Sequence, residues 1–433
     1  MWSTPSPSVR CGCVWRRRGA YWMNWGEGPE SVRRNRVGAP VPTSGIVFGV
    51  RTLHTEMTMR YASFPKIPGL EVSVLGFGAM RLPTVGGDVT RIDYEIATPL
   101  LHEAISAGIN YVDTAWPYHG GESEMFLGRA LHGGWREKVK LATKSPVWAV
   151  RSEGDWERIV DAQLKKLDTE RIDFYLMHAL SGPRWDAVKR LRGMEALERA
   201  RLDGRIDHVG FSFHGSCDDF KRIVDAYDWE FCQIQLNYLD EAFQAGLEGL
   251  RYAAARGIGV IAMEPLRGGA LARVPPPVEA IFKHSGKPWS PAEWALRWVW
   301  AQPGVVTVLS GMNLQAQLRE NLMAASTPAA LDMAPLREAE GFYRARAKVN
   351  CTTCGYCQPC PSGVSIPETF AAYATATMFD SKAVAAWMYE TFVLKNEAGA
   401  DRCVSCGECE ARCPQLIPIA EKLREAHAYL TSR

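Results

Sequence analysis

The sequence contains no apolar run of the length that a membrane-spanning helix requires. Its longest candidate, Ala295–Gly311, is interrupted by Arg297 and Pro303, whereas a spanning helix needs about 20 apolar residues. The sequence also lacks a large charge of either sign: the formal net charge is +2, so there is no reason to expect nucleic acid or an anionic membrane as partner. With 47% hydrophobic and 23% charged residues, the composition is typical of a soluble globular protein.

Lysine is missing from residues 1–58, although this stretch holds eight arginines. The pairs Arg17–Arg18 and Arg33–Arg34 raise the idea of a twin-arginine export signal. Prolines and an arginine interrupt the segment where an apolar signal region would have to follow. We therefore expect an unstructured extension, or a start codon assigned upstream of a true start at Met57 or Met59.

A G-x-G-x-x-G turn after an early strand is also missing, which weighs against a doubly wound open sheet. From Arg60 onward, short β-branched and aromatic runs alternate with amphipathic stretches. Strands are expected at Ser73–Gly78, Asn110–Thr114, Val139–Lys144, Ile172–His178, His208–Phe213, Phe231–Gln235, Gly259–Met263 and Val305–Ser310. Helices are expected at Tyr94–Ala107, Ser123–Leu131, Trp156–Leu167, Val188–Asp203, Asp218–Asp228, Gly246–Arg256, Pro291–Ala301 and Leu314–Met323. Eight strand–helix units predict an α/β fold, a (β/α)8 TIM barrel over residues 59–323, whose chemistry collects at the C-terminal ends of the strands.

Cysteine is scarce before residue 351, and eight of the twelve cysteines fall between Cys351 and Cys413. The other four have no partner pattern: Cys11, Cys13, Cys217 and Cys232. A disulfide framework belongs to small domains that lack a core. Closely spaced cysteines behind a large cysteine-poor domain instead indicate metal ligation in a reducing compartment, and so a cytoplasmic protein.

The cysteine-rich segment predicts a ferredoxin-like module with two [4Fe-4S] clusters over residues 349–433. Its second run has the spacing C-x2-C-x2-C-x3-C-P and comprises Cys403, Cys406, Cys409 and Cys413. Bacterial-type two-cluster ferredoxins use this run, and its fourth cysteine reaches across to the other cluster. The first run is one residue shorter before its last cysteine and comprises Cys351, Cys354, Cys357 and Cys360. A linker and helix over 324–348 precede the module, and a helical stretch, Ala371–Val393, separates the two runs.

The ligand sets follow from the crossed pattern of such ferredoxins. One cluster would be held by Cys351, Cys354, Cys357 and Cys413. The other would be held by Cys403, Cys406, Cys409 and Cys360. The shorter first run leaves ligation within each run open. Structural zinc is the alternative, because C-x2-C pairs also form Zn(Cys)4 sites, but a third cysteine at the same step and a following proline favour clusters.

Four polar residues at successive strand ends suggest proton-transfer machinery: Asp113, Tyr118, Lys144 and His178. On a barrel these ends converge. A tyrosine is a poor acid at neutral pH, but an adjacent ammonium is expected to lower its pKa, with a carboxylate holding the ammonium in place. A neutral histidine can then donate a hydrogen bond to a carbonyl oxygen that gains negative charge.

Residues from about Arg60 to Leu322 resemble an aldo-keto reductase. The string Tyr111-Val-Asp-Thr-Ala…Tyr118, followed by Gly121-Glu-Ser-Glu124…Leu127-Gly-Arg-Ala130, is similar to the family's second strand and helix. The resemblance implies Tyr118 as general acid, tuned by Lys144 and Asp113, with His178 orienting the substrate carbonyl. Together with the cysteine module, the chain resembles the iron–sulfur-containing branch of this family.

The resemblance also implies a nicotinamide cofactor, NADPH or NADH. Ser212 and Gln233 match side chains that hold the carboxamide, and Met263 stands where an aromatic residue often stacks on the ring. Pro265, Leu266 and Gly268 resemble the pyrophosphate turn. The adenosine end corresponds to Ser310, Gly311, Met312, Gln317, Glu320 and Asn321, of which Glu320 and Asn321 would meet the adenine. Gln317 is often arginine in the family and binds the 2′-phosphate, so its neutrality leaves the choice between NADPH and NADH open.

Two functions remain open on the sequence alone. The first is an enzyme that transfers hydride between NAD(P)H and a small-molecule carbonyl or alcohol, with Tyr118 as proton donor. The second is an electron-transfer protein whose clusters relay single electrons to a protein partner, with the barrel as a docking or cofactor platform. The complete set of four strand-end residues favours the enzyme.

Overall fold

The structure is a computed structural model, and it describes residues 58–351, 355, 357–413 and 415–432. The extension over residues 1–58 and the cluster residue Cys354 therefore lie outside the described residues, apart from Thr58. Within the described parts, no helix is long and apolar enough to cross a membrane.

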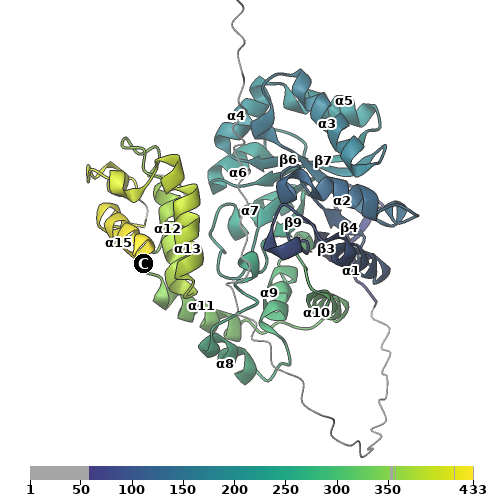
Figure 1. The fold of residues 1–433 in the computed structure, drawn as a ribbon. Coiled ribbons are helices and arrows are strands. Elements are labelled where there is room, and N and C mark those ends of the chain that lie inside the picture. Colours follow the sequence, from purple (N-terminus) through teal and green to yellow (C-terminus); the bar gives the residue numbers. More distant parts are fainter. Residues whose placement is uncertain (1–57, 352–354, 356, 414, 433) are drawn as a thin grey trace, which may run out of the picture.

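Eight parallel strands close into a barrel, which confirms the predicted fold class (Figure 1). They are β3 (Leu75–Gly78), β4 (Tyr111–Asp113), β5 (Lys140–Ser145), β6 (Ile172–Leu180), β7 (Ile206–Phe213), β8 (Phe231–Gln235), β9 (Gly259–Met263) and β10 (Val305–Ser310). Each strand pairs with the next along the chain, and β10 pairs with β3 to close the ring. Every functional residue that follows a strand is thereby brought to one end of the barrel, here called the mouth.

Helices surround the barrel, as the 3.6-residue periodicity of the sequence predicts. They are α1 (Tyr94–Ser106), α2 (Ser123–Ala130), α3 (Gly154–Leu167), α4 (Gly182–Arg190), α5 (Gly193–Leu202), α6 (Cys217–Val224), α7 (Gly246–Ala254), α8 (Pro276–His284), α9 (Pro291–Trp300) and α10 (Gln315–Ser326). The stretch Val188–Asp203 is divided between α4 and α5, because Arg192 between them adopts a left-handed conformation with φ 51°. Helix α8 lies outside the regular units and was not predicted.

A short hairpin closes the end of the barrel opposite the mouth. Its strands are β1 (Tyr61–Ser63) and β2 (Glu71–Ser73), which pair antiparallel. Between them, Phe64 inserts into the barrel with its ring 5.2 Å from that of Phe174 and 5.9 Å from that of Phe231. A side chain at Gly259 would lie 2.4 Å from the Phe64 ring, so glycine is required where this plug meets β9.

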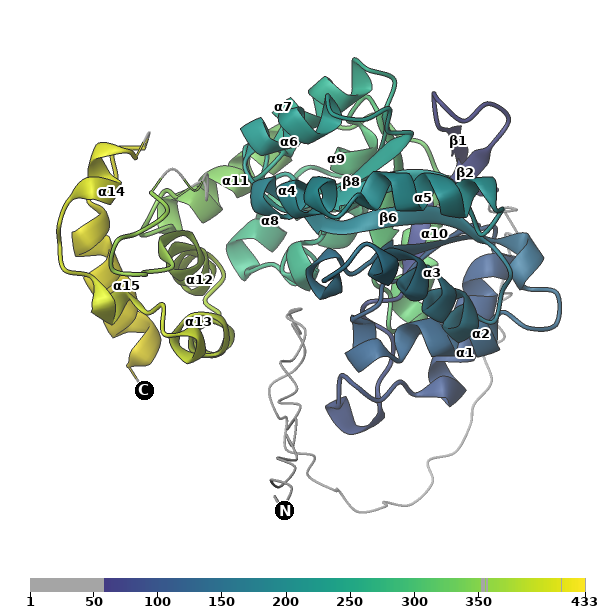
Figure 2. The ribbon, with the colours of Figure 1, turned by 90° about the horizontal axis from the view of Figure 1, so that it is seen from above.

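The cysteine module is a separate helical unit joined to the barrel by α11 (Ala334–Arg346), as Figures 1 and 2 show. Its helices are α12 (Ile366–Met378), α13 (Lys382–Phe392), α14 (Glu408–Ala411) and α15 (Ile419–Thr431). The stretch Ala371–Val393, expected to be helical, is divided between α12 and α13, because the chain breaks after Met378 and Asp380 adopts a left-handed φ of 54°. Helix α12 packs against both α13 and α15 around a core that includes Phe370, Tyr389 and Leu423.

The module contacts the barrel through the break between α12 and α13. The Phe379 ring lies 4.9 Å from the Tyr343 ring of α11, and the Arg267 guanidinium lies over its face at 4.9 Å. Asp380 forms an ion pair with Arg346 at 3.1 Å. Because Arg267 belongs to the loop after β9, the module touches a loop of the mouth.

Candidate active site

The mouth holds a buried lysine between a carboxylate and a tyrosine. Lys144, at the end of β5, donates from Nζ to Asp113 Oδ1 at 2.6 Å and to the Thr114 carbonyl at 2.8 Å. The same Nζ atom lies 3.4 Å from the hydroxyl oxygen of Tyr118. All three side chains are almost fully buried. The structure therefore brings three of the four predicted residues together from two strands and one loop.

His178 completes the group from β6, where the strand is irregular. The register between β6 and β7 shifts between Met177 and Leu180, and Ala179 has a φ of 53°. A bulge of this kind re-aims a side chain at a sheet rim. Ser212 stabilises it by accepting a hydrogen bond from the Ala179 amide at 2.7 Å. The His178 ring then stands 6.1 Å from the Tyr118 ring, roughly perpendicular to it.

Burial controls the ionisation of all four residues. It raises the pKa of Tyr118 well above its ordinary value, and the Asp113 and Glu264 carboxylates add to this, while Arg81 opposes it. The expectation of a lowered tyrosine pKa was wrong, because desolvation, with the Asp113 and Glu264 carboxylates, raises the pKa by more than nearby positive charge lowers it. Burial also lowers the pKa of Lys144 and raises that of Asp113, and their ion pair opposes both shifts. The pKa of His178 falls well below its ordinary value through burial and nearby cations, so its ring is neutral.

The structure reveals mouth residues that the sequence analysis did not identify. Arg81, after β3, pairs with Glu264, after β9, at 3.2 Å. Trp148, after β5, has its ring 5.0 Å from the His178 ring. Position after a strand end was the one signal available for these residues, but their pairing across the mouth depends on barrel closure.

The side chain of His119 is bonded to the loop between β3 and α1. Its Nε2 atom accepts from the Leu82 amide at 3.2 Å, and its Nδ1 atom lies 2.7 Å from the Val89 carbonyl. Since a neutral histidine carries one donor and one acceptor, this pair of contacts fixes its tautomer. The residue next to Tyr118 therefore anchors the β3–α1 loop.

The predicted carboxamide contacts lie side by side. Ser212 and Gln233 are register partners on β7 and β8, and both are buried. The Gln233 Oε1 atom is buried with no hydrogen-bond partner among the described residues, although buried polar atoms are normally satisfied. Met263 is the last residue of β9, and Pro265, Leu266 and Gly268 follow it in a tight turn in which Gly268 has a φ of 69°. Ser212 and Gln233 fit a planar amide group, and the turn fits a pyrophosphate that comes close to the backbone.

The predicted adenosine end is occupied by contacts within the chain. Gln317 Oε1 accepts from the amides of Asn313 and Leu314 at 2.9 and 3.2 Å, so it caps α10. Asn321 donates to the Ser310 hydroxyl at 2.9 Å. Glu320 accepts from the Ser290 hydroxyl. Met312 is buried in the core, and Gly311 faces the Arg81 side chain. The structure thus places these six residues together but directs most of their polar groups to one another.

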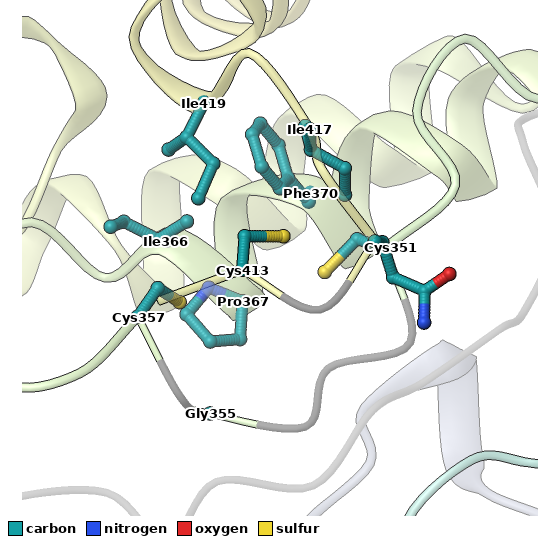
Figure 3. A pocket seen from close by; sticks show the side chains of 10 residues that line it. Cys351, Gly355, Cys357, Ile366, Pro367, Phe370, Cys413, Ile417 and Ile419 are labelled. Atoms are coloured by element: carbon teal, nitrogen blue, oxygen red, sulfur yellow. The ribbon is translucent and has the colours of Figure 1, made fainter. Parts of the chain in front are cut away.

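The cysteines of the module gather into two groups. Cys351 and Cys357 of the first run line one cavity together with Cys413 of the second (Figure 3). Apolar side chains cover this cavity: Ile366, Pro367, Phe370, Ile417 and Ile419. In the second group, burial raises the pKa of Cys409, and Cys403 and Cys360 lie close enough to add to the shift. Both groups combine cysteines from the two runs, but among the described residues no three His, Cys, Asp or Glu side chains lie close enough together to hold a metal ion. Cys406 is exposed.

The comparison with protein families settles the nature of the two domains. Residues 74–334 match the model of the Aldo/keto reductase family. The chain belongs to the aldo/keto reductase family. Residues 350–417 match the 4Fe-4S dicluster domain, which favours iron–sulfur ligation over the zinc alternative. This aldo/keto reductase is therefore an oxidoreductase with a C-terminal 4Fe-4S domain.

Similar proteins cover the reductase domain. L-galactose dehydrogenase of Arabidopsis thaliana is 28% identical over 61% of this chain and 88% of its own length. An uncharacterized oxidoreductase, YrpG of Bacillus subtilis, is 29% identical over 59% of this chain and 88% of its own length. Among solved structures, the holo form of aldo-keto reductase AKR11C1 from Bacillus halodurans is 25% identical, with a TM-score of 0.54, over 65% of this chain and 96% of that one.

Proposed function

We propose that this aldo/keto reductase transfers hydride between NAD(P)H and an aldehyde or ketone, with Tyr118 as proton donor. The observation that carries the proposal is the buried contact of Tyr118 with Lys144, which is itself held by Asp113 at 2.6 Å. A structural ion pair would need no tyrosine hydroxyl and no neutral histidine beside it. These four groups meet at the mouth, where barrels of this kind hold their active sites.

The side chains divide the work of the reaction. The nicotinamide would supply the hydride to the carbonyl carbon. Tyr118, kept protonated by burial, donates its proton to the carbonyl oxygen as negative charge develops there. Lys144 then stabilises the tyrosinate that remains, because its ammonium lies against the same oxygen. His178, neutral at physiological pH, donates a hydrogen bond that orients the carbonyl.

The cofactor would be held by residues from three neighbouring strands. Gln233 offers a buried amide oxygen without a partner among the described residues, which suits the amino group of the carboxamide, and Ser212 stands beside it. Pro265, Leu266 and Gly268 would approach the pyrophosphate. Binding of the adenosine end would require Gln317, Glu320 and Asn321 to exchange their internal hydrogen bonds for the ligand, so both NADPH and NADH belong in the assay.

The module would hold two [4Fe-4S] clusters, which supply one-electron chemistry when bound. The cavity lined by Cys351, Cys357 and Cys413 suits a cluster, since the three thiols lie beside mainly apolar side chains and none of the described lining residues is acidic. Cys354, outside the described residues, would be its fourth ligand. Cys360, Cys403, Cys406 and Cys409 would hold the second cluster.

A relay of single electrons to a protein partner is the second candidate. Cys406 is exposed, as are two apolar side chains that lie close to cluster cysteines in the sequence: Val404, two residues before Cys406, and Leu416, three residues after Cys413. Exposed apolar residues beside a cluster ligand are features of a docking surface. This candidate assigns no role to Tyr118, which separates it from the first.

The deciding experiment uses the full chain purified without oxygen. Iron and sulfide are counted, and oxidation of NADPH and NADH is followed with a panel of aldehydes and ketones. Tyr118→Phe is compared with Cys406→Ala in the same assay. Loss of general acid catalysis is expected to lower kcat by about 100- to 10,000-fold in Tyr118→Phe, with cofactor binding retained, while Cys406→Ala keeps carbonyl reduction. Turnover that requires a one-electron acceptor, is lost in Cys406→Ala and ignores Tyr118 would overturn the proposal in favour of the relay.

A further inference from the structure

Arg184 lies in the wall of the mouth beside the proposed catalytic histidine. It belongs to the first turn of α4, which begins shortly after β6 ends. Its guanidinium lies over the ring of Trp148, with Cζ 5.4 Å from the ring centroid. The Trp148 ring also lies near His178, with ring centroids 5.0 Å apart. Arg184 also donates from Nη1 to the carbonyl of Ala179 at 2.6 Å.

This arginine differs from the other cations of the mouth in having no acidic partner within the part of the chain that the structure describes. Lys144 pairs with Asp113, Arg81 with Glu264, and Arg267 with Asp240. Among the described residues, no carboxylate lies within ion-pair distance of the Arg184 guanidinium. The side chain is nevertheless partly buried, and burial lowers its pKa. A charge that loses water without gaining an opposite charge is costly, so this position is explained best by an anion that arrives with a ligand.

We propose that Arg184 binds a carboxylate of the substrate, so that the enzyme acts on aldehydes or ketones that carry a carboxylate a short carbon chain from the carbonyl. The inference rests on the proposed hydride-transfer function. Arg184 is a specificity-determining residue in this proposal, since it holds the part of the substrate that does not react.

The geometry favours a carboxylate over a doubly charged phosphate. One guanidinium supplies a single positive charge, and with Nη1 engaged at Ala179 its remaining N–H groups still form a fork that matches two carboxylate oxygens. Both Arg184 and His178 lie near the Trp148 ring, so a substrate chain that packs along this ring could reach both of them. A purely neutral substrate, by contrast, would leave the guanidinium without an opposite charge in the closed site.

The test compares each acid with its own neutral ester. The substrates are 4-oxobutanoate and 4-formylbenzoate, each beside its methyl ester, with NADPH and NADH. The enzymes are the wild-type chain, Arg184→Met, Arg184→Lys, and Arg190→Met as the matched control, since Arg190 is exposed on the same helix. Binding of 4-formylbenzoate to each variant is measured by calorimetry, so that recognition has a readout independent of turnover.

We expect the wild type to prefer the acids. Arg184→Met should lower the acid-to-ester ratio of kcat/KM by about 10- to 100-fold, mainly through KM, because a charge-assisted pair is lost. Arg184→Lys should retain part of the preference, and Arg190→Met all of it. Equal use of acid and ester by the wild type would overturn the inference. An equal fall in kcat for both substrates in Arg184→Met would also overturn it, since the arginine would then only brace Ala179 and His178. Binding of the acid that depends on Arg184 without any turnover would support the inference and refute the proposed hydride transfer.

Discussion

At the scale of single residues, burial raises the pKa of Tyr118 and lowers the pKa of His178, and both shifts favour the uncharged side chain. The tyrosine is held protonated because its anion would be desolvated beside Asp113 and Glu264. The histidine is held neutral because its cation would be desolvated near Lys144, His214 and Arg184. Both are therefore in the state that carbonyl reduction requires before any substrate binds; Tyr118 must regain its proton after each reduction, and its raised pKa favours that return at neutral pH.

This has a consequence for the pH dependence of reduction. We expect kcat/KM to stay level from about pH 5.5 to about pH 7.5, because a histidine with an ordinary pKa near 6.5 would cause an acidic fall there. The pKa of His178 lies well below that value, so His178 does not cause such a fall. The fall at higher pH should come from Lys144, whose pKa is lowered by burial. Loss of its charge as pH rises removes the cation that stabilises the tyrosinate. Initial rates over this range, at constant ionic strength, give the profile. An acidic fall with a midpoint near 6.5 would show that His178 titrates normally.

At the scale of secondary-structure elements, α2 and α3 approach each other more closely than a side chain would allow. A Cβ atom on Gly128 would lie 2.5 Å from the carbonyl oxygen of Lys166 and 2.9 Å from the carbonyl carbon of Leu167. The same contact brings Glu124 of α2 to Gln163 of α3, and Glu124 also accepts from Thr143 at 2.7 Å. Gln163 in turn donates to the backbone carbonyl of Lys144 at 3.1 Å. The close pair of helices thus supports the strand that carries the lysine.

Gly128→Ala should therefore destabilise the protein. The added methyl group meets backbone atoms that cannot move aside, and such overpacking costs about 1–3 kcal/mol. Urea unfolding followed by circular dichroism measures the change. The control is Gly154→Ala at the start of α3, where a Cβ atom would meet nothing within 4 Å, so stability should be unchanged or slightly higher. Equal effects of the two substitutions would contradict the close approach of α2 and α3.

The elements themselves could be predicted from the sequence far better than the pairs between them. The strand Gly259–Met263 was predicted with its observed limits, because a short β-branched run between glycine and glutamate is typical of a buried strand. The break at Asp380 was missed, since its flanks are equally helical in composition. Barrel closure brings Arg81 to Glu264, two residues far apart in the chain, and periodicity carries no information on such contacts. The pKa of Tyr118 was misjudged for the same reason: a neighbouring lysine is visible in the sequence, but the depth of burial is not.

At the scale of the whole molecule, the iron–sulfur module touches the loop that would receive the cofactor. Arg267, between Leu266 and Gly268, lies over the ring of Phe379 at 4.9 Å and pairs with Asp240 at 3.2 Å. The ring of Phe379 therefore limits the movement of this loop from the module side. Ordering a loop costs free energy on binding, and a loop already held by the module avoids part of that cost.

Phe379→Ala should weaken NAD(P)H binding by about 2- to 20-fold, because the cation–π contact that restrains Arg267 is lost. The dissociation constant can be measured by quenching of tryptophan fluorescence. Trp387→Ala serves as the control, since Trp387 is a large, exposed aromatic residue of the same module, on α13. An unchanged dissociation constant in Phe379→Ala would show that the module and the cofactor loop act independently.

The cavity lined by Cys351, Cys357 and Cys413 determines when during synthesis a cluster could be inserted. These thiols come from opposite ends of the module, and α12 and α13 lie between them in the chain. A cluster bound there would close one long loop, which no part of the module can do before Cys413 has been synthesised. The barrel precedes the module and can fold during synthesis. Cluster delivery would then follow the synthesis of the barrel and of most of the module, and a truncation shortly before Cys413 would leave a folded reductase barrel whose first cluster cannot be completed.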